Sequence, residues 1–255
     1  MRRPRRRRRI PSEGIYLLPN LLTCAGLFCG LCAVLLSGEG QFIRSALAIL
    51  GAMLFDGLDG KVARATRSST RFGLELDSLA DLVAFGVAPA VLAYRWHLAA
   101  FGRWGWLACG LYVICGALRL ARFNLQAYTV ESRHFQGLPV PAAACALVSL
   151  MLCCGQTRGG GAVVLLAMYP LALLMVSGLR YPGFKDLGLY HRHPLSALVC
   201  LVLLAALLGA RPRLMLLLGS LGYVMAGPVG TLPLWRRLAR RRQASWSTFG
   251  SSTPP

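Results

Sequence analysis

Four aspartates lie close together in a chain that otherwise has few acidic residues. Asp56 and Asp59 are three residues apart, and Asp77 and Asp81 are four residues apart. These spacings place the two side chains of each pair on one face of an α-helix. Two such faces turned toward each other would bring four carboxylates together, and hard divalent cations prefer oxygen ligands of this kind. The pattern therefore predicts a metal site built by two helices.

The helices that carry these aspartates are expected to lie in a membrane. The chain has 255 residues, 56% of them hydrophobic, and a mean hydropathy of +0.55, whereas soluble domains average roughly 45–50% apolar residues. A helix needs roughly 20 apolar residues to cross a bilayer. We predict an all-α integral membrane protein with about eight spans: 17–36, 43–63, 79–98, 104–121, 139–155, 161–179, 194–210 and 213–231. In this scheme a six-helix core holds the site at the cytoplasmic ends of spans 2 and 3. Six spans with two shallow segments is the alternative.

Basic residues are distributed unevenly along the chain. The net charge is +19, and threading the eight spans puts 22 of the 28 Lys and Arg residues on one side of the membrane. Cytoplasmic segments carry such an excess, so both termini and the aspartates are expected in the cytoplasm. We expect a disordered basic arm over 1–14, one helical membrane domain over 15–235, and a basic, then disordered, tail over 236–255. The basic segments would face anionic lipid headgroups rather than nucleic acid.

Other features on this side of the membrane could assist the aspartates. Three connections, 64–76, 122–138 and 180–193, are long enough to carry chemistry. Glu75 lies between the two aspartate pairs, but its helical register points away from Asp77 and Asp81, so we expect a structural role for it.

Gly26 and Gly30 give the first span a small-residue face, which allows close helix packing either within the chain or in a homodimer.

The aspartates belong to a longer pattern, Asp-Gly-x2-Ala-Arg-x8-Gly-x3-Asp-x3-Asp, which extends from Asp59 to Asp81 with Asp56 just upstream. This pattern resembles the signature of the CDP-alcohol phosphotransferase family. Further stretches look like the bacterial, membrane-integral branch of that family that uses serine: Pro19–Thr23, Ser78–Pro89, Ala117–Asn124, Phe135–Pro141 and Arg180–Lys185. Together the similar pieces cover about residues 15–190.

The resemblance implies an enzyme of the bacterial inner membrane that transfers a phosphatidyl group from CDP-diacylglycerol to L-serine, giving phosphatidylserine and CMP. It implies Mg²⁺ or Mn²⁺ held by Asp56, Asp59, Asp77 and Asp81, with Asp81 also accepting the serine hydroxyl proton. Contacts to CDP-diacylglycerol carry over to Asn20, Thr23, Gly60, Arg64 and Thr70. Serine brings a carboxylate and an ammonium group, so its pocket needs a cation and hydrogen-bond acceptors. The candidates for binding serine or phosphate are Arg119, Arg122, Asn124 and Arg180.

Other interpretations of these residues stay open. The same signature would suit an acceptor such as glycerol 3-phosphate or an inositol phosphate. A cation transporter could use the carboxylates as an ion relay, but it would be expected to carry polar residues in several spans near the midplane. Here the ionisable groups gather at one rim. Arg119 and Arg122 would also serve as membrane anchors whose side chains reach toward headgroups.

Overall fold

The structure, a computed structural model, describes residues 17–66, 70–128, 137–155, 157, 159–179, 181 and 211–231. Within these ranges every regular element is a helix, which confirms the prediction of an all-α protein. The helices are α1 (Leu17–Gly38), α2 (Phe42–Thr66), α3 (Arg71–Asp81), η2 (Leu82–Val87), α4 (Ala88–Ala93), η3 (Tyr94–Leu98), η4 (Ala99–Phe101), α5 (Arg103–Tyr128), α6 (Val140–Cys154), α7 (Gly160–Val176) and α9 (Pro212–Thr231).

The lengths and compositions of the helices are those of a membrane protein. Among the described residues, four stretches are long and apolar enough to cross a bilayer: Leu17–Gly38, Arg71–Phe101, Arg103–Gln126 and Pro212–Val229. Two further apolar helices are shorter, since α6 has 15 residues and α7 has 17. The 25 residues of α2 include both Asp56 and Asp59, which lowers its hydropathy. The predicted span 194–210 lies outside the described residues.

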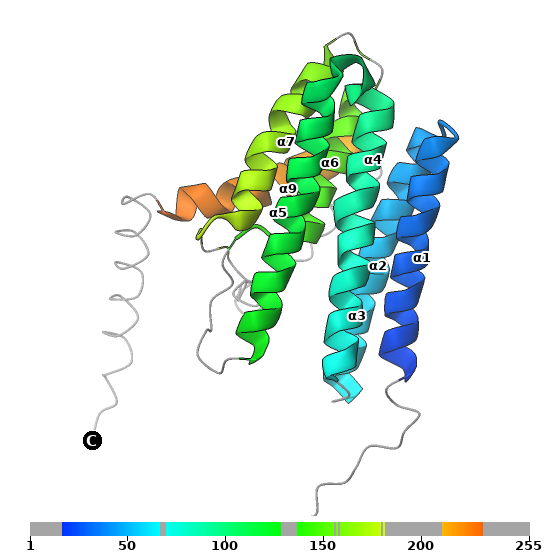
Figure 1. The fold of residues 1–255 in the computed structure, drawn as a ribbon, viewed down its shortest axis with the longest axis vertical. Helices are drawn as coiled ribbons and strands as arrows, with labels where there is room; N and C mark the ends of the chain where they lie inside the picture. Colours follow the sequence, from blue (N-terminus) through cyan, green and yellow to red (C-terminus); the bar gives the residue numbers. More distant parts are fainter. Residues whose placement is uncertain are drawn as a thin grey trace, which may run out of the picture.

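The helices that carry the aspartates lie side by side. Figure 1 shows α1 beside α2 and the continuous helix that begins with α3, and these neighbours also share residue contacts. α5 packs against α7, and α6 packs against both α7 and α9. In Figure 1, α9 runs obliquely across the other helices. Fully buried side chains from α4 and α6, among them Leu92, Leu147 and Met151, belong to the hydrophobic core.

The helix that carries Asp77 and Asp81 starts earlier than predicted. Residues 64–76 were expected to form a connection, but α3 begins at Arg71 because Thr70 caps it: Thr70 Oγ1 accepts a hydrogen bond of 3.0 Å from Gly73 N. The helix then continues to Phe101 through two π-helical segments, η2 and η3. The fourth helix is also longer than predicted, in this case at its C-terminal end: α5 continues past 121 to Tyr128.

The small-residue face of α1 packs within the chain. A Cβ atom added to Gly30 would lie 2.7 Å from Ala84 Cα, which belongs to η2, and one added to Gly26 would lie 3.6 Å from Phe55 Cβ on α2. Helix backbones approach this closely only where side chains are absent. The face therefore holds α1 against both aspartate-bearing helices, and it is not presented to a second copy.

Gly30→Ala is expected to lower the thermal unfolding temperature and the activity of the protein. The contact it would create is with backbone, which cannot rotate away, and overpacking of this kind costs about 1–3 kcal/mol. Gly51→Ala is the matched control, because a Cβ at Gly51 meets nothing within 4 Å and alanine favours the helix. Unfolding in lipid nanodiscs measures both variants. Equal unfolding temperatures would show that α1 and η2 can move apart without loss of stability.

Candidate active site

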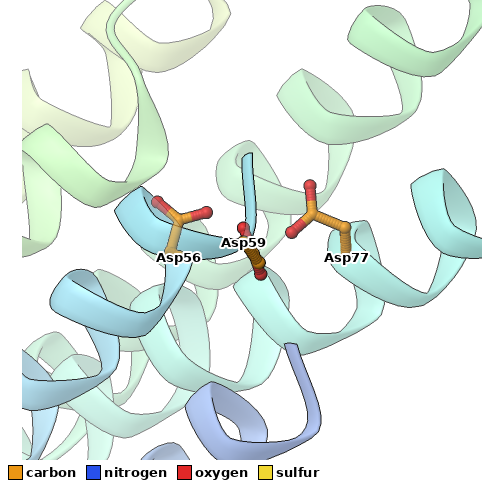
Figure 2. Close-up of side chains that lie close together, drawn as sticks. All are labelled: Asp56, Asp59 and Asp77. Atoms are coloured by element: carbon orange, nitrogen blue, oxygen red, sulfur yellow. The ribbon is translucent and has the colours of Figure 1, made fainter. Parts of the chain in front are cut away.

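Three carboxylates from two helices converge at one point. One oxygen each from Asp56, Asp59 and Asp77 can be chosen so that all lie within 4.8 Å of one another. Figure 2 shows the side chain of Asp59 between those of Asp56 and Asp77. Asp81 lies outside this group of three, but it lines the same small cavity, of about 10 Å³, together with the other three aspartates. The structure thus brings the four predicted residues to one cavity from α2 and α3.

The cavity fits a divalent cation. Two carboxylates about 5 Å apart repel each other by about 3 kcal/mol at an effective dielectric constant of 20. This repulsion disfavours the cluster unless a positive charge lies among its members. The donors are all carboxylate oxygens, which suit hard cations, and the volume is about that of one water molecule. Asp56, Asp59, Asp77 and Asp81 therefore have the chemistry to hold such an ion.

A residue of α1 orients the central aspartate. Thr23 Oγ1 donates a hydrogen bond to Asp59 Oδ2 at 2.9 Å and lies 3.1 Å from the carbonyl oxygen of Pro19. Both side chains are buried, with Thr23 and Asp59 each 6% exposed. A buried hydrogen bond of this kind limits the rotation of the carboxylate. Thr23 was predicted as a contact for CDP-diacylglycerol; in the structure its hydroxyl positions the carboxylate of Asp59.

A second cavity opens beside the first. Its volume is about 130 Å³, and it is lined by Pro19, Asn20, Thr23, Asp59, Gly60, Ala63, Thr70, Gly73, Leu74 and Asp77. Four of the five residues predicted to contact CDP-diacylglycerol line it: Asn20, Thr23, Gly60 and Thr70. The fifth, Arg64, lies at its edge, since Arg64 Nη1 is 3.5 Å from the position of a Cβ on Gly60. Three helices therefore place these residues around one space.

Gly73, a fixed position of the sequence pattern, allows the first turn of α3 to approach α1. A Cβ at this position would lie 3.1 Å from Asn20 Oδ1 and 3.1 Å from Thr70 Oγ1. Contacts this short would push Asn20 or the cap aside. The glycine therefore keeps both hydroxyl and amide groups at the wall of the second cavity.

The two arginines near the end of α5 have different surroundings in the structure. Arg119 is half-buried and lies within electrostatic range of Asp56 and Asp81. Arg122 points to another helix, where its Nη1 donates a hydrogen bond of 3.1 Å to the carbonyl oxygen of Val176 at the end of α7. A cation is favourable at such a helix C-terminus. Arg119 is therefore beside the carboxylates, and Arg122 ties α5 to α7. Arg180, the other predicted cation, lies outside the described residues.

Asn124 links α5 to α3. Its Oδ1 accepts a hydrogen bond of 3.0 Å from Ser78 Oγ, and its Nδ2 donates one of 3.0 Å to Glu75 Oε2. Sequence reasoning predicted Asn124 as a substrate contact and did not anticipate its two partners. Glu75 and Ser78 are three residues apart, so their shared helix face was a usable signal, but nothing in the sequence named α5 as the partner.

Comparison with known proteins places the chain in a family. The profile of the CDP-alcohol phosphatidyltransferase family matches residues 16–178, a range that contains both cavities. The chain belongs to this family. The predicted resemblance is thereby confirmed, and the matched range extends from α1 to the end of α7.

Individual family members with curated names are similar over most of the chain. A CDP-diacylglycerol–serine O-phosphatidyltransferase of Helicobacter pylori is 41% identical over 180 residues, which are 69% of this chain and 76% of the relative. The archaetidylserine synthase of Methanothermobacter thermautotrophicus is 38% identical over 173 residues, 67% of this chain and 72% of the relative. A CDP-diacylglycerol–serine O-phosphatidyltransferase of Bacillus subtilis is 36% identical over 170 residues, 66% of this chain and 91% of the relative.

Proposed function

We propose that this protein transfers the phosphatidyl group of CDP-diacylglycerol to L-serine, with phosphatidylserine and CMP as products. The observation that carries the proposal is the four-aspartate cavity, which lies inside the range matched by the family. The acceptor is supported by the relatives, because the bacterial ones are named for serine and the archaeal one for archaetidylserine.

The aspartates would supply the metal chemistry of the reaction. Asp56, Asp59, Asp77 and Asp81 would hold Mg²⁺ or Mn²⁺, and such an ion neutralises the charge that develops on the diphosphate during transfer. The cytidine diphosphate part of the lipid would occupy the adjacent cavity. There Thr70 and Asn20 offer hydrogen bonds, Gly60 leaves room for close approach, and Arg64 offers a forked set of donors to phosphate.

Asp81 would act as the base. The serine hydroxyl oxygen forms a new bond to the lipid-side phosphorus while the bond from that phosphorus to the CMP oxygen breaks. The hydroxyl proton passes to the Asp81 carboxylate, which lines the cavity and lies within electrostatic range of Arg119. Arg119 would then stabilise the negative charge of the incoming carboxylate or of the phosphate. Positioning and charge neutralisation account for most of the catalysis in such a reaction.

We place the site at the cytoplasmic face of a bacterial inner membrane, with both termini in the cytoplasm. The uneven distribution of Lys and Arg supports this orientation. The helical domain over 15–235 would lie in the bilayer, and the basic segments at both ends would face anionic headgroups. Serine and CMP, which are water-soluble, would then exchange with the cytoplasm, and the two lipids would stay in the membrane.

The function is tested with purified protein in nanodiscs that contain CDP-diacylglycerol, labelled serine and either Mg²⁺ or Mn²⁺. We expect labelled phosphatidylserine and an equal amount of CMP, complete loss of both with EDTA, and recovery when the ion is restored. Parallel reactions replace serine with glycerol 3-phosphate or an inositol phosphate. A faster reaction with one of these would reassign the acceptor, and cation flux without CMP release would favour a transporter.

Arg119→Lys is expected to cut kcat/KM for serine about tenfold, which is about 1.4 kcal/mol of transition-state stabilisation. Lysine keeps the positive charge but loses the bidentate geometry of the guanidinium. Arg122→Lys is the matched control on the same helix, since Arg122 contacts a backbone carbonyl of α7 instead. Steady-state kinetics with varied serine measure both. Equal behaviour of the two variants would give Arg119 a structural role rather than a role in binding serine.

A further inference from the structure

We propose that the end of the molecule opposite the aspartates binds the headgroup phosphate of an anionic phospholipid. A cavity of about 630 Å³ lies there, between the starts of α2 and α9 and the end of α6. Its lining includes Phe42, Arg44, Trp96, Leu152 and Arg213. Arg44 and Asp59 are 15 positions apart in α2, a rise of about 22 Å. The cavity is therefore separate from the proposed active site.

The cavity is lined by two arginines that lack an acidic partner. Arg44 and Arg213 lie in the first turns of α2 and α9, and neither first turn contains an acidic residue. Within the described part of the chain, neither guanidinium forms an ion pair: Arg44 Nη1 donates a hydrogen bond of 2.7 Å to Gln41 Oε1. Glu39, the nearest acid in the sequence, accepts its hydrogen bond from Gln41 instead. Since cations are unfavourable at helix N-termini, an anion bound by both arginines would be stabilising.

Trp96 adds a polar group that also lacks a partner. Its ring stacks on Phe42, with the ring centroids 5.3 Å apart. Its Nε1 is buried and has no hydrogen-bond acceptor among the residues that the structure describes. A buried N–H group without an acceptor is unfavourable. An oxygen atom of a ligand in the cavity would provide this acceptor, either directly or through a bridging water molecule.

The apolar part of the cavity favours a lipid over a small soluble anion. Phe42, Ile43 and Leu152 line it beside the arginines, and they offer contacts for a glycerol backbone and the first carbons of acyl chains. The volume falls within the range of roughly 300–1,000 Å³ that is usual for ligand sites. Arginine and tryptophan side chains are typical of the headgroup level of a bilayer. In the proposed orientation, the bound lipid belongs to the outer leaflet of the membrane.

The net charge of the headgroup should decide which lipid binds. A phosphatidylglycerol headgroup carries only the negative phosphate, whereas phosphatidylcholine adds an ammonium group that the two arginines would repel. Native mass spectrometry of the full-length protein, titrated with either lipid on identical acyl chains, measures the first lipid that is retained. We expect the wild-type protein to retain phosphatidylglycerol at a concentration about tenfold lower than phosphatidylcholine.

The double variant Arg44→Gln with Arg213→Gln tests the two cations. Its affinity for phosphatidylglycerol should fall about tenfold or more, and that for phosphatidylcholine should stay unchanged. Arg103→Gln is the matched control, because Arg103 is an exposed arginine at the same end of the molecule that lies outside this cavity. An equal fall in Arg103→Gln would mean that only the general surface charge attracts the lipid, and the site would be disproved.

Inorganic phosphate in excess separates a lipid site from a site for small anions. Displacement of phosphatidylglycerol by phosphate alone would overturn the lipid assignment, and retention supports it. Unfolding temperatures show whether each variant has folded. If the double variant does not fold, the single variants Arg44→Gln and Arg213→Gln provide the test, with a loss of about threefold expected for each. No measurement uses serine or a metal ion, so the result does not depend on the proposed function.

Discussion

Asp77→Asn is expected to lower the rate of phosphatidyl transfer about a thousandfold, or about 4 kcal/mol in activation free energy. Asp77 is the one member of the three-carboxylate group that comes from α3, and the other two come from α2. Its loss would leave a bound ion held from one side and would remove a negative charge that attracts the ion. Asparagine keeps the size and one neutral oxygen, so the helix packing should be preserved.

The measurement is the rate of CMP release at increasing concentrations of Mg²⁺ or Mn²⁺. A ligand variant should need more metal ion for half-maximal activity and should still fall short at saturation. Asp56→Asn and Asp59→Asn should behave in the same way. Glu39→Gln is the control, because Glu39 is an exposed carboxylate in the turn between α1 and α2, and this variant should match the wild-type protein. Near wild-type turnover in any one of the three aspartate variants would remove that residue from the metal site. Unfolding temperatures in nanodiscs confirm that each variant has folded.

Asp81→Asn is expected to abolish turnover while leaving the binding of CDP-diacylglycerol almost normal. Asp81 lines the four-aspartate cavity but lies outside the close group of three, a position suited to a base. An amide cannot accept the serine proton, and loss of general base catalysis typically costs about a hundredfold to ten-thousandfold. Equilibrium binding of labelled CDP-diacylglycerol and single-turnover rates, measured on one preparation, separate the two effects.

The contrasting result for Asp81→Asn would be equal loss of binding and turnover. In that case Asp81 serves mainly as a metal ligand, and the proton leaves through another group or water. Asp77→Asn provides the comparison, because a pure ligand variant should lose metal affinity together with rate. The two variants thus differ in metal dependence as well as in lipid binding.

The sequence predicted the convergence of the four aspartates because its geometry is local. Residues three or four apart in a helix must share a face, so the pairing of Asp56 with Asp59 required no knowledge of the fold. The meeting of α2 and α3 was inferred from the cost of placing carboxylates in an apolar segment. The predicted contacts for CDP-diacylglycerol came from the family resemblance instead, and most of them, such as Asn20 and Thr70, line one space.

The sequence did not predict contacts between distant segments or the ends of helices. The hydrogen bond between Thr23 and Asp59 joins residues 36 positions apart, and periodicity within one helix says nothing about such a pair. Arg119 and Arg122 are equivalent as residues at the end of a span, and only the placement of α7 distinguishes them. The predicted start of this helix came too late in the chain because the prediction followed hydropathy alone. Thr70, a residue type that favours the N-cap position, was the available signal for the earlier start.

The π-helical segment η2 sets how the part of the helix that carries Asp77 and Asp81 is rotated relative to the part that follows it. A π turn holds one more residue than an α turn, and each residue of an α-helix turns the chain by about 100°. Deleting one residue within Leu82–Val87 would therefore rotate Asp77 and Asp81 by about a quarter turn relative to buried residues such as Leu92. The extra residue of this turn therefore sets the direction of the two carboxylates relative to the packed part of the helix. The same turn also packs against α1, with Ala84 facing Gly30, so one residue more or less at this point would change the aim of the carboxylates and the helix contact together.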